Sequence, residues 1–364
     1  MQRYYFDHNA TTPLAPEVLD AMLPALTEVY GNASSLHHFG QVARQRLDEA
    51  RRTVASFLGA KSAEIVFTSG GTESDQMAIL GQHHVITTTV EHPAVLNAAR
   101  QNDHATFVPV DSRGLVDPDD IRKALRPGVS LISVMHANNE LGTIQPIEAI
   151  SALAREARIP FHSDGVQAAG KIPVNVSELG VDLYSIAAHK IYGPKGVGVL
   201  FNKARIRRAG TDNVAGALGL AAALQWEARH GVAEAARVGV LRDRLEQSVL
   251  DRIPGMHVNG AGAPRVPNTS NLRFDGIDSE PLLIALDLRG FAVSSGSACS
   301  SGAAEPSHVL QAIGLTKEQS RSSLRISLGR SNDAAQVDAL VDALVECVAH
   351  LRRIAPERPA PAYA

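Results

Sequence analysis

The sequence predicts an α/β fold, in which a large domain with a mostly parallel central sheet is followed by a smaller α+β domain. Between about residues 64 and 201, short runs rich in β-branched residues alternate with helical patterns, which is typical of a parallel sheet. After Thr211 a long Ala-rich helical stretch replaces that alternation. The 364 residues are 45% hydrophobic and 20% charged, so the chain can build a large core and is long enough for two domains.

Seven short runs are expected to form the strands of the central sheet, because they are rich in residues that favour extended backbone. They are Glu64–Thr68, Val85–Thr89, Ala105–Val110, Leu131–Met135, Ile159–His162, Leu183–Ile186 and Gly196–Phe201. A helix is expected ahead of them, since apolar residues recur at steps of four and three from Ala43 to Phe57.

The smaller domain is expected to follow a helix from about Val214 to about Leu250. We expect residues 14–245 to form the large domain, and residues 1–13 with 246–364 to form the small one. The elements expected in the small domain are strands at "MHVN", "SNLRF", "FAVSS" and "SLRISL", a helix at "EPLLIALDL", a helix that starts at Glu305, and a helix from about Asp333 to Ile354.

Charge and cysteine content exclude several classes of protein. A net charge of -3 lacks the basic excess that nucleic-acid and membrane-surface proteins normally carry. Two cysteines cannot form a disulfide framework, and no CxxC pair indicates a zinc site, so no metal is expected. The start "MQRYYFDHNATTPLAPEV" does not resemble a secretory signal, and no apolar run is long enough to span a membrane. We therefore expect a cytoplasmic protein.

The two cysteines stand in different settings. Cys347 lies one helical turn from both Leu344 and Leu351, on the apolar face of the last expected helix, so it should be a buried hydrophobic residue. Cys299 lies in "VSSGSACSSG", which has almost nothing to pack. Its setting alone fits either an incidental exposed thiol or an accessible nucleophile.

The first strand is followed by a glycine-rich turn that could hold an anion. In open α/β sheets, ligands collect beyond the carboxyl ends of the strands. The segment "SGGTE" places Gly71 and Thr72 where a helix begins, and backbone N–H groups at such a place suit a phosphate. It is not a Walker A loop, because no Gly-Lys-Ser/Thr follows. A tight strand-to-helix turn explains this fragment equally well.

The other strand ends add polar side chains of complementary kinds. The residues in question are His92, His136, Asn138, Asn139, Asp164, Gln167, His189 and Lys190. One alone would be interpreted as a cap or turn residue. Together they offer the lysine, the carboxylate and the phosphate cup that pyridoxal phosphate needs. Lys190 is the best placed lysine, and Lys195, between a Gly-Pro pair and a glycine, is its rival.

Nine runs in the chain resemble those of cysteine desulfurases of the NifS/IscS type, in the class V branch of the fold-type-I pyridoxal-phosphate enzymes. The runs are "YFDHNATTP", "TSGGTES", "EHPAV", "MHANNELG", "SDGVQ", "HKIYGPKG", "AGTDN", "SSGSACSSGAAEPSHVL" and "SSLRISLGR". They occur in the order of that family and cover nearly the whole chain. No single run is decisive, but nine in order are highly specific.

The resemblance implies a role at the cofactor for several residues. Lys190 would carry pyridoxal phosphate as a Schiff base, Asp164 would pair with its ring nitrogen, and His92 would stack on its ring. The remaining cofactor contacts implied are Gln167 and Asn139 at the ring oxygen or the substrate, and Gly71, Thr72 and His189 at the phosphate.

The resemblance also implies substrate and subunit contacts. Arg325 would bind the substrate carboxylate, for which a guanidinium is a bidentate match, and Asn32 would assist there. Thr211 would reach the phosphate of the neighbouring subunit, which implies a homodimer. Lys190 would move the Cα proton, and Cys299 would then attack the sulfur of L-cysteine, leaving L-alanine and a persulfide.

The implied function is transfer of sulfur from L-cysteine to acceptor proteins, for iron–sulfur cluster assembly or thiolation. Alternatives on the same scaffold are a selenocysteine lyase or a sulfinate-releasing relative, although the long cysteine loop favours the desulfurases. An alternative of another class is an inactive protein that docks onto sulfur-transfer machinery. Retention of Lys190, Asp164, His92 and Cys299 argues against it.

The sequence departs from the family pattern in two respects. Ala187 stands where a serine often contacts the phosphate, which predicts somewhat weaker cofactor binding. The connections near 81–82 and 206–207 are unusually short, and a Gly-rich segment expected near the second is absent. Either the sequence lacks residues there or these connections are truly short.

Overall fold

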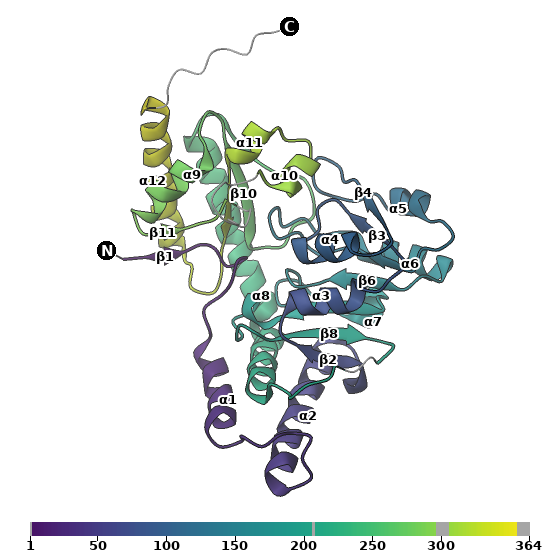
Figure 1. Ribbon diagram of the computed structural model, residues 1–364. Coiled ribbons are helices and arrows are strands. Elements are labelled where there is room, and N and C mark those ends of the chain that lie inside the picture. The colour runs from purple at the N-terminus through teal and green to yellow at the C-terminus, as the bar shows by residue number, and fades with distance from the viewer. Residues whose placement is uncertain (1, 206–207, 296–305, 355–364) are drawn as a thin grey trace.

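A seven-stranded, mostly parallel sheet forms the centre of the larger part of the molecule (Figure 1). The computed structural model describes residues 2–205, 208–295 and 306–354. The strand order is β2-β8-β7-β6-β5-β3-β4, and β8 runs antiparallel to both of its neighbours. The strands are β2 (Ile65–Thr68), β3 (His84–Thr88), β4 (His104–Val108), β5 (Leu131–Ser133), β6 (Phe161–Asp164), β7 (Leu183–Ala187) and β8 (Gly198–Asn202). All seven strands expected from the sequence are confirmed, with small shifts at their ends.

Helices cover both faces of this sheet, as α/β architecture requires. The expected helix ahead of the sheet is α2, in which Ala43, Leu47, Ala50 and Val54 are buried. It ends where Gly59 adopts a left-handed conformation with φ +67. The helices of this part are α1 (Pro16–Thr27), α2 (His38–Leu58), η1 (Ser62–Glu64), α3 (Gly71–Ile79), α4 (Pro93–Arg100), α5 (Pro118–Ala124), α6 (Ile147–Ala157), α7 (Val176–Leu179) and η2 (Ala188–Lys190).

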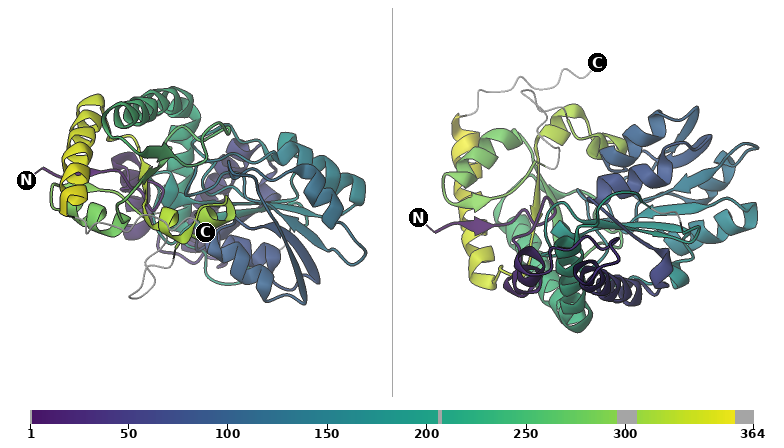
Figure 2. Two further views of the ribbon diagram at one scale, coloured as in Figure 1. Left: turned by 90° about the horizontal axis from the view of Figure 1, so that it is seen from above. Right: turned by 60° about the horizontal axis from the view of Figure 1, so that its bottom comes forward.

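The long helix α8 (Val214–Arg252) runs from this sheet to a second, smaller assembly, and Figure 2 shows it from two further sides. That assembly has an antiparallel sheet of order β12-β10-β9 and a parallel pair of β1 with β11. Its elements are β1 (Tyr4–Tyr5), β9 (Met256–Val258), β10 (Thr269–Phe274), α9 (Ser279–Asp287), β11 (Phe291–Ala292), α10 (His308–Ala312), α11 (Lys317–Arg321), β12 (Ser323–Ser327) and α12 (Ala334–Ile354).

The two assemblies have separate hydrophobic cores. The core beside the large sheet includes the fully buried Tyr184 and Phe161. The second core joins Phe6, from the N-terminal segment, to α12 and to the C-terminal half of α8. The N-terminal segment therefore packs with the C-terminal part of the chain.

Two expectations about chain segments change in detail. The helix expected from Glu305 begins, within the described residues, at His308, where the Ser307 hydroxyl accepts a hydrogen bond from the Leu310 N–H at 3.1 Å. Glu305 itself lies outside the described residues, as do residues 206–207. At the other short connection, Gly81 has φ +81 and the Gln82 N–H donates to the Ile79 carbonyl at 3.4 Å, so a tight turn joins α3 to β3.

No helix among the described residues is both long and apolar enough to cross a membrane.

Cys347 is buried, with 2% of its surface exposed, and burial raises the pKa of its thiol. We expect Cys347→Ser to lower the free energy of unfolding by about 1–3 kcal/mol, because it buries a hydroxyl in an apolar core. Urea denaturation measures this. Cys347→Ala removes the thiol without burying a polar group and should cost less. Equal stability of the serine variant and the wild type would contradict a buried Cys347.

Candidate active site

Polar groups from strands distant in sequence converge at one edge of the large sheet. β5, β6 and β7 are adjacent and parallel, so the residues that follow them lie side by side. The Lys190 ammonium donates to the backbone carbonyls of Asn9 and Ala10, at 2.8 Å for Ala10. The Gln167 amide donates to the same Asn9 carbonyl at 3.0 Å. The N-terminal segment thus closes over the strand ends.

Lys190 is the lysine of this cluster, at the end of the short helix η2 that follows β7. Burial, with a further contribution from Arg325, lowers the pKa of Lys190 to about 8. The neutral amine, the form that a proton acceptor requires, is therefore more accessible near neutral pH than for an ordinary lysine. Lys195, the rival, is exposed.

Asp164, the last residue of β6, is a buried carboxylate with little compensation. It is 5% exposed, and its Oδ1 accepts a hydrogen bond from the Val166 N–H at 2.9 Å. Burial raises the pKa of Asp164 to about 6, although Lys190 opposes the rise. A protonated ring nitrogen beside this carboxylate would supply the missing positive partner. The acid therefore fits the pyridinium of pyridoxal phosphate.

His92 caps helix α4, where its Nδ1 accepts a hydrogen bond from the Ala94 N–H at 3.1 Å. Burial and the nearby Lys190 lower the pKa of His92 to about 4, so the ring is neutral. A neutral, partly buried imidazole is a suitable surface for another ring. The preceding Glu91 is fully buried, and its carboxylate accepts from the Thr88 hydroxyl at 2.7 Å and from the Met135 N–H.

The glycine-rich turn after β2 leads directly into α3. Gly70 has φ +153, which strongly favours glycine, and a side chain at Gly71 would meet the Val166 Cγ2 at 2.7 Å. Thr72 is exposed on the first turn of the helix. His189 bonds to the Thr11 hydroxyl at 3.1 Å, and burial lowers its pKa to about 4. The bare backbone and helix start are compatible with a phosphate group.

Arg325 lies on β12 and reaches this edge of the large sheet from the smaller assembly. It is 5% exposed, and it donates to the Asp7 carboxylate at 2.7 Å and to the Asn139 carbonyl at 3.2 Å. None of the described residues forms a hydrogen bond with its buried Nε. A guanidinium with an unused donor fits a carboxylate ligand.

Three residues expected at the site are not placed there. No hydrogen bond or ion pair within the described residues joins Asn32 or Thr211 to this cluster, and Cys299 is not among the described residues. Asn32 is exposed and accepts a local hydrogen bond from the Ser34 N–H at 2.9 Å. Thr211 is exposed just ahead of α8.

The structure adds Asn9 and Lys171 to the residues expected from the sequence. Asn9 lies in the run "YFDHNATTP", which by itself assigns no role to the asparagine. Lys171 follows Gln167 by four residues in "QAAGK", and that spacing was the available signal. The Lys171 amine donates to the Asn9 Oδ1 at 2.9 Å and to the Gln167 Oε1.

Comparison with known proteins agrees with this geometry. The family model described as aminotransferase class-V matches residues 4–208 and 202–340. The cysteine desulfurase IscS of Dictyoglomus turgidum is 46% identical over 378 residues, covering 97% of this chain and 96% of that protein. A solved structure titled NifS-like protein superimposes with a TM-score of 0.88 at 32% identity, covering 96% of this chain and 100% of that one. A structure titled SspA in complex with cysteine has a TM-score of 0.79 at 31% identity, covering 89% and 98%.

The fold and the site define a pyridoxal-phosphate-dependent enzyme. The chain belongs to the aminotransferase class-V family, and its relatives within that family are proteins named cysteine desulfurase. The family and the fold inferred from the sequence motifs are therefore confirmed. The two pieces of the family match meet at residues 202–208, the second of the two places where the sequence indicated a short connection.

Ala187 provides a test of the phosphate contacts. It is 3% exposed, and its Cβ lies 3.8 Å from the position of a Cβ on Gly71, so it faces the glycine-rich turn. We expect Ala187→Ser to tighten cofactor binding roughly 2- to 10-fold, because it adds one neutral hydrogen bond. Titration of apo-enzyme with pyridoxal phosphate measures this. Ala187→Val, which adds bulk without a donor, should not tighten binding, and unchanged affinity of the serine variant would contradict the prediction.

Proposed function

We propose that this enzyme is a cysteine desulfurase that removes sulfur from L-cysteine, releases L-alanine and holds the sulfur as a persulfide on Cys299. The arrangement of Asp164, Lys190 and Arg325 carries the proposal. It combines a buried acid, an amine with a lowered pKa and a buried guanidinium with an unused donor. Relatives named cysteine desulfurase and a structural neighbour titled as a complex with cysteine support the choice of substrate.

The residues of the site divide the work of binding. Lys190 carries the cofactor, Asp164 pairs with its ring nitrogen, and His92 packs on its ring face. When bound, pyridoxal phosphate supplies an electron sink that makes the bonds at the substrate Cα easier to break. The other cofactor contacts we assign are Gly71, Thr72 and His189 at the phosphate, and Gln167 and Asn139 at the ring oxygen or the substrate.

Arg325 and Lys190 act on the substrate. The Arg325 guanidinium would hold the substrate carboxylate through its unused donor, while Asp7 and Asn139 fix the orientation of the guanidinium. Lys190, with its pKa of about 8, can take the proton from the substrate Cα as a neutral amine and return it as an ammonium. Only the family resemblance supports a role for Asn32 at the substrate carboxylate.

The sulfur passes to Cys299. An S–S bond forms between the Cys299 thiolate and the substrate sulfur while the substrate Cβ–S bond breaks, and the electron pair left on Cβ takes up a proton to give alanine. The chain on either side of residues 296–305 is anchored beside the site. Ser294 exchanges two backbone hydrogen bonds with Arg325, at 2.7 and 3.1 Å, and the Ser307 hydroxyl donates to Glu140 at 2.6 Å.

The product persulfide implies a protein that accepts sulfur, such as an iron–sulfur scaffold or a thiolation factor, in the cytoplasm. We also propose the domain division expected from the sequence, with residues 14–245 as the large domain. The separate core formed by Phe6, α12 and the end of α8 supports it. A selenocysteine lyase remains the alternative on this scaffold, and selenocysteine in place of L-cysteine distinguishes it.

A homodimer is the assembly we propose. Large apolar side chains are exposed on α1, in the segment that follows it and at the start of α2, a region that a second copy of this chain could cover. They include Leu23 at 51%, Leu26 at 60%, Tyr30 at 72%, Leu36 at 91% and Phe39 at 52%. The rings of Tyr30 and Phe39 stack with centroids 5.4 Å apart. In this assembly Thr211 would contact the phosphate bound by the other copy.

The function is tested by incubating the cofactor-loaded enzyme with L-cysteine and a thiol reductant, and by measuring sulfide and alanine. Equal amounts of both are expected from the wild type. Cys299→Ala should stop sulfide release, and Lys190→Ala should slow the reaction by at least ~10²-fold. Cys347→Ala is the matched control and should behave as the wild type. Full sulfide release by Cys299→Ala would overturn the assignment of the nucleophile, and release of neither product by the wild type would overturn the function.

The dimer is tested by light scattering after size exclusion. Leu36→Asp should shift the protein toward the monomer, because it places a charge in the proposed interface without disturbing a buried contact. Leu288→Asp changes a residue that is 71% exposed on the smaller assembly and is the matched control. A wild-type monomer, or an equal effect of both variants, would contradict this interface.

A further inference from the structure

Lys171 is a second lysine at the active site, and the proposed reaction does not use it. Its amine donates to two side-chain oxygens, the Asn9 Oδ1 at 2.9 Å and the Gln167 Oε1. Burial, the neighbouring Lys190 and Arg325 lower its pKa well below the usual value, while Glu227 raises it. A lysine placed against two cations, at a cost in stability, requires an explanation.

The number of N–H donors on a lysine amine explains why a lysine lies here. A side-chain amide can turn over and exchange its oxygen for its NH₂ group with almost no change in shape, so its partners decide its orientation. A lysine ammonium has three N–H bonds and no acceptor, and a neutral amine still has two N–H bonds. In either protonation state Lys171 can supply both hydrogen bonds. In the structure the side-chain oxygens of Asn9 and Gln167 face Lys171, and the ammonium form, which has no lone pair, excludes the reversed orientation of either amide.

This contact fixes the orientation of the Gln167 amide and therefore the direction of its NH₂ group. With its Oε1 held by Lys171, the Nε2 points to the Asn9 carbonyl, 3.0 Å away, which the Lys190 amine also contacts. One N–H bond of the NH₂ group is used there. The NH₂ group keeps a second N–H bond for another acceptor.

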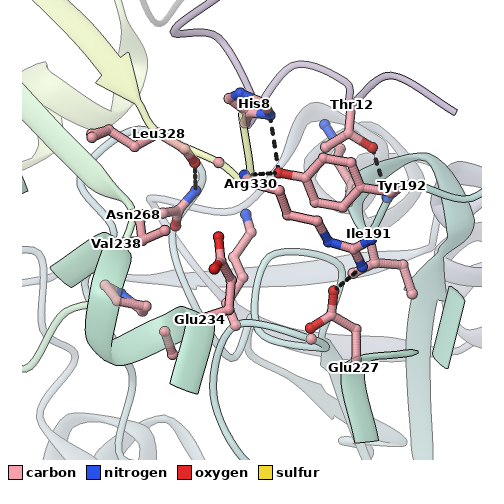
Figure 3. A pocket seen from close by; sticks show the side chains of 16 residues that line it. His8, Thr12, Ile191, Tyr192, Glu227, Glu234, Val238, Asn268, Leu328 and Arg330 are labelled. Carbon is pink, nitrogen blue, oxygen red and sulfur yellow. Dashed lines mark hydrogen bonds and ion pairs between the residues drawn. The ribbon is translucent and has the colours of Figure 1, made fainter. Parts of the chain in front are cut away.

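Lys171 bonds to the two amides although a carboxylate, that of Glu227, lies in the same surroundings. A cavity of about 50 Å³ adjoins both Lys171 and Lys190, and Figure 3 shows some of its lining residues, among them Tyr192, Glu227 and Arg330. The Glu227 carboxylate is bound by Arg330 at 2.7 Å. The side-chain oxygens to which Lys171 donates belong to two amides, while the Glu227 carboxylate is bound by Arg330.

We propose that Lys171 is a positioning residue, which locks the Gln167 amide so that an N–H donor, and never the carbonyl oxygen, faces the ring oxygen of the cofactor. The inference rests on the proposed function for the placement of the cofactor ring beside Gln167. A donor at the ring oxygen stabilises its negative charge and so lowers the pKa of the neighbouring nitrogen that joins the cofactor to Lys190. Loss of Lys171 frees Gln167 to turn over.

The experiment is a pH titration of the visible absorbance of cofactor-loaded enzyme in the absence of L-cysteine. Lys171→Met should raise the midpoint by about 0.5–1 pH unit, the equivalent of one hydrogen bond. In a Gln167→Leu background the same substitution should move the midpoint by less than about half as much, because Lys171 acts through Gln167. Lys195→Met removes an exposed charge near the site and serves as the control.

Two results would overturn the proposal. One is an equal shift for Lys171→Met in both backgrounds or for Lys195→Met, which would show that charge alone acts. The other is an unchanged midpoint for Lys171→Met. If that variant does not fold, Gln167→Glu tests the same point, because it keeps the shape and replaces the donor by an acceptor, so it must raise the midpoint. Sulfide release plays no part in the titration, so failure of the proposed function would be seen separately.

Discussion

The arrangement of this molecule depends on Asn9, whose polar groups all make hydrogen bonds. Its N–H donates to the Ser327 hydroxyl at 2.9 Å, and its carbonyl accepts from Gln167 and Lys190. Its side-chain NH₂ donates to the Thr269 hydroxyl at 2.8 Å and to the Asn139 carbonyl. An asparagine that is 1% exposed must satisfy these groups, so its contacts tie the N-terminal segment, the small sheet and the ends of the large sheet to one geometry.

That geometry brings charges together that water would otherwise separate. Burial raises the pKa of Asp164 and lowers that of Lys190, which are opposite directions with one cause. Arg325 is compensated by Asp7, at 2.7 Å, whereas Asp164 has no ion-pair partner within the described part of the chain. A buried acid without a positive partner fits a ligand that brings positive charge. The protonated ring nitrogen of pyridoxal phosphate, the cofactor of this family, is such a group.

The strands and the polar side chains at their ends could be predicted from the sequence, because both leave local patterns. The β-branched runs between turn residues located all seven strands, with errors only at their ends. Asp164 was expected just after a strand and is the last residue of β6. The strand starts two residues later than expected, at Phe161, because Pro160 lacks the N–H group that a strand uses. Asn9 and Lys171 could not be predicted in this way. Their contact joins positions 162 residues apart, and an asparagine near the N-terminus has no distinguishing pattern until the fold places it.

The position of Arg325 relative to Lys190 depends on a polar connection between the two assemblies. Arg330, five residues beyond Arg325, lies with its guanidinium carbon 3.3 Å from the centre of the Trp226 ring and 4.1 Å from that of Tyr192. It also binds Glu227 at 2.7 Å. Each of these contacts is directional, unlike apolar packing, which tolerates sliding. Directional contacts at Asn9 and at Arg330 therefore fix the distance between the guanidinium and the amine, the two groups to which the proposed function assigns the substrate.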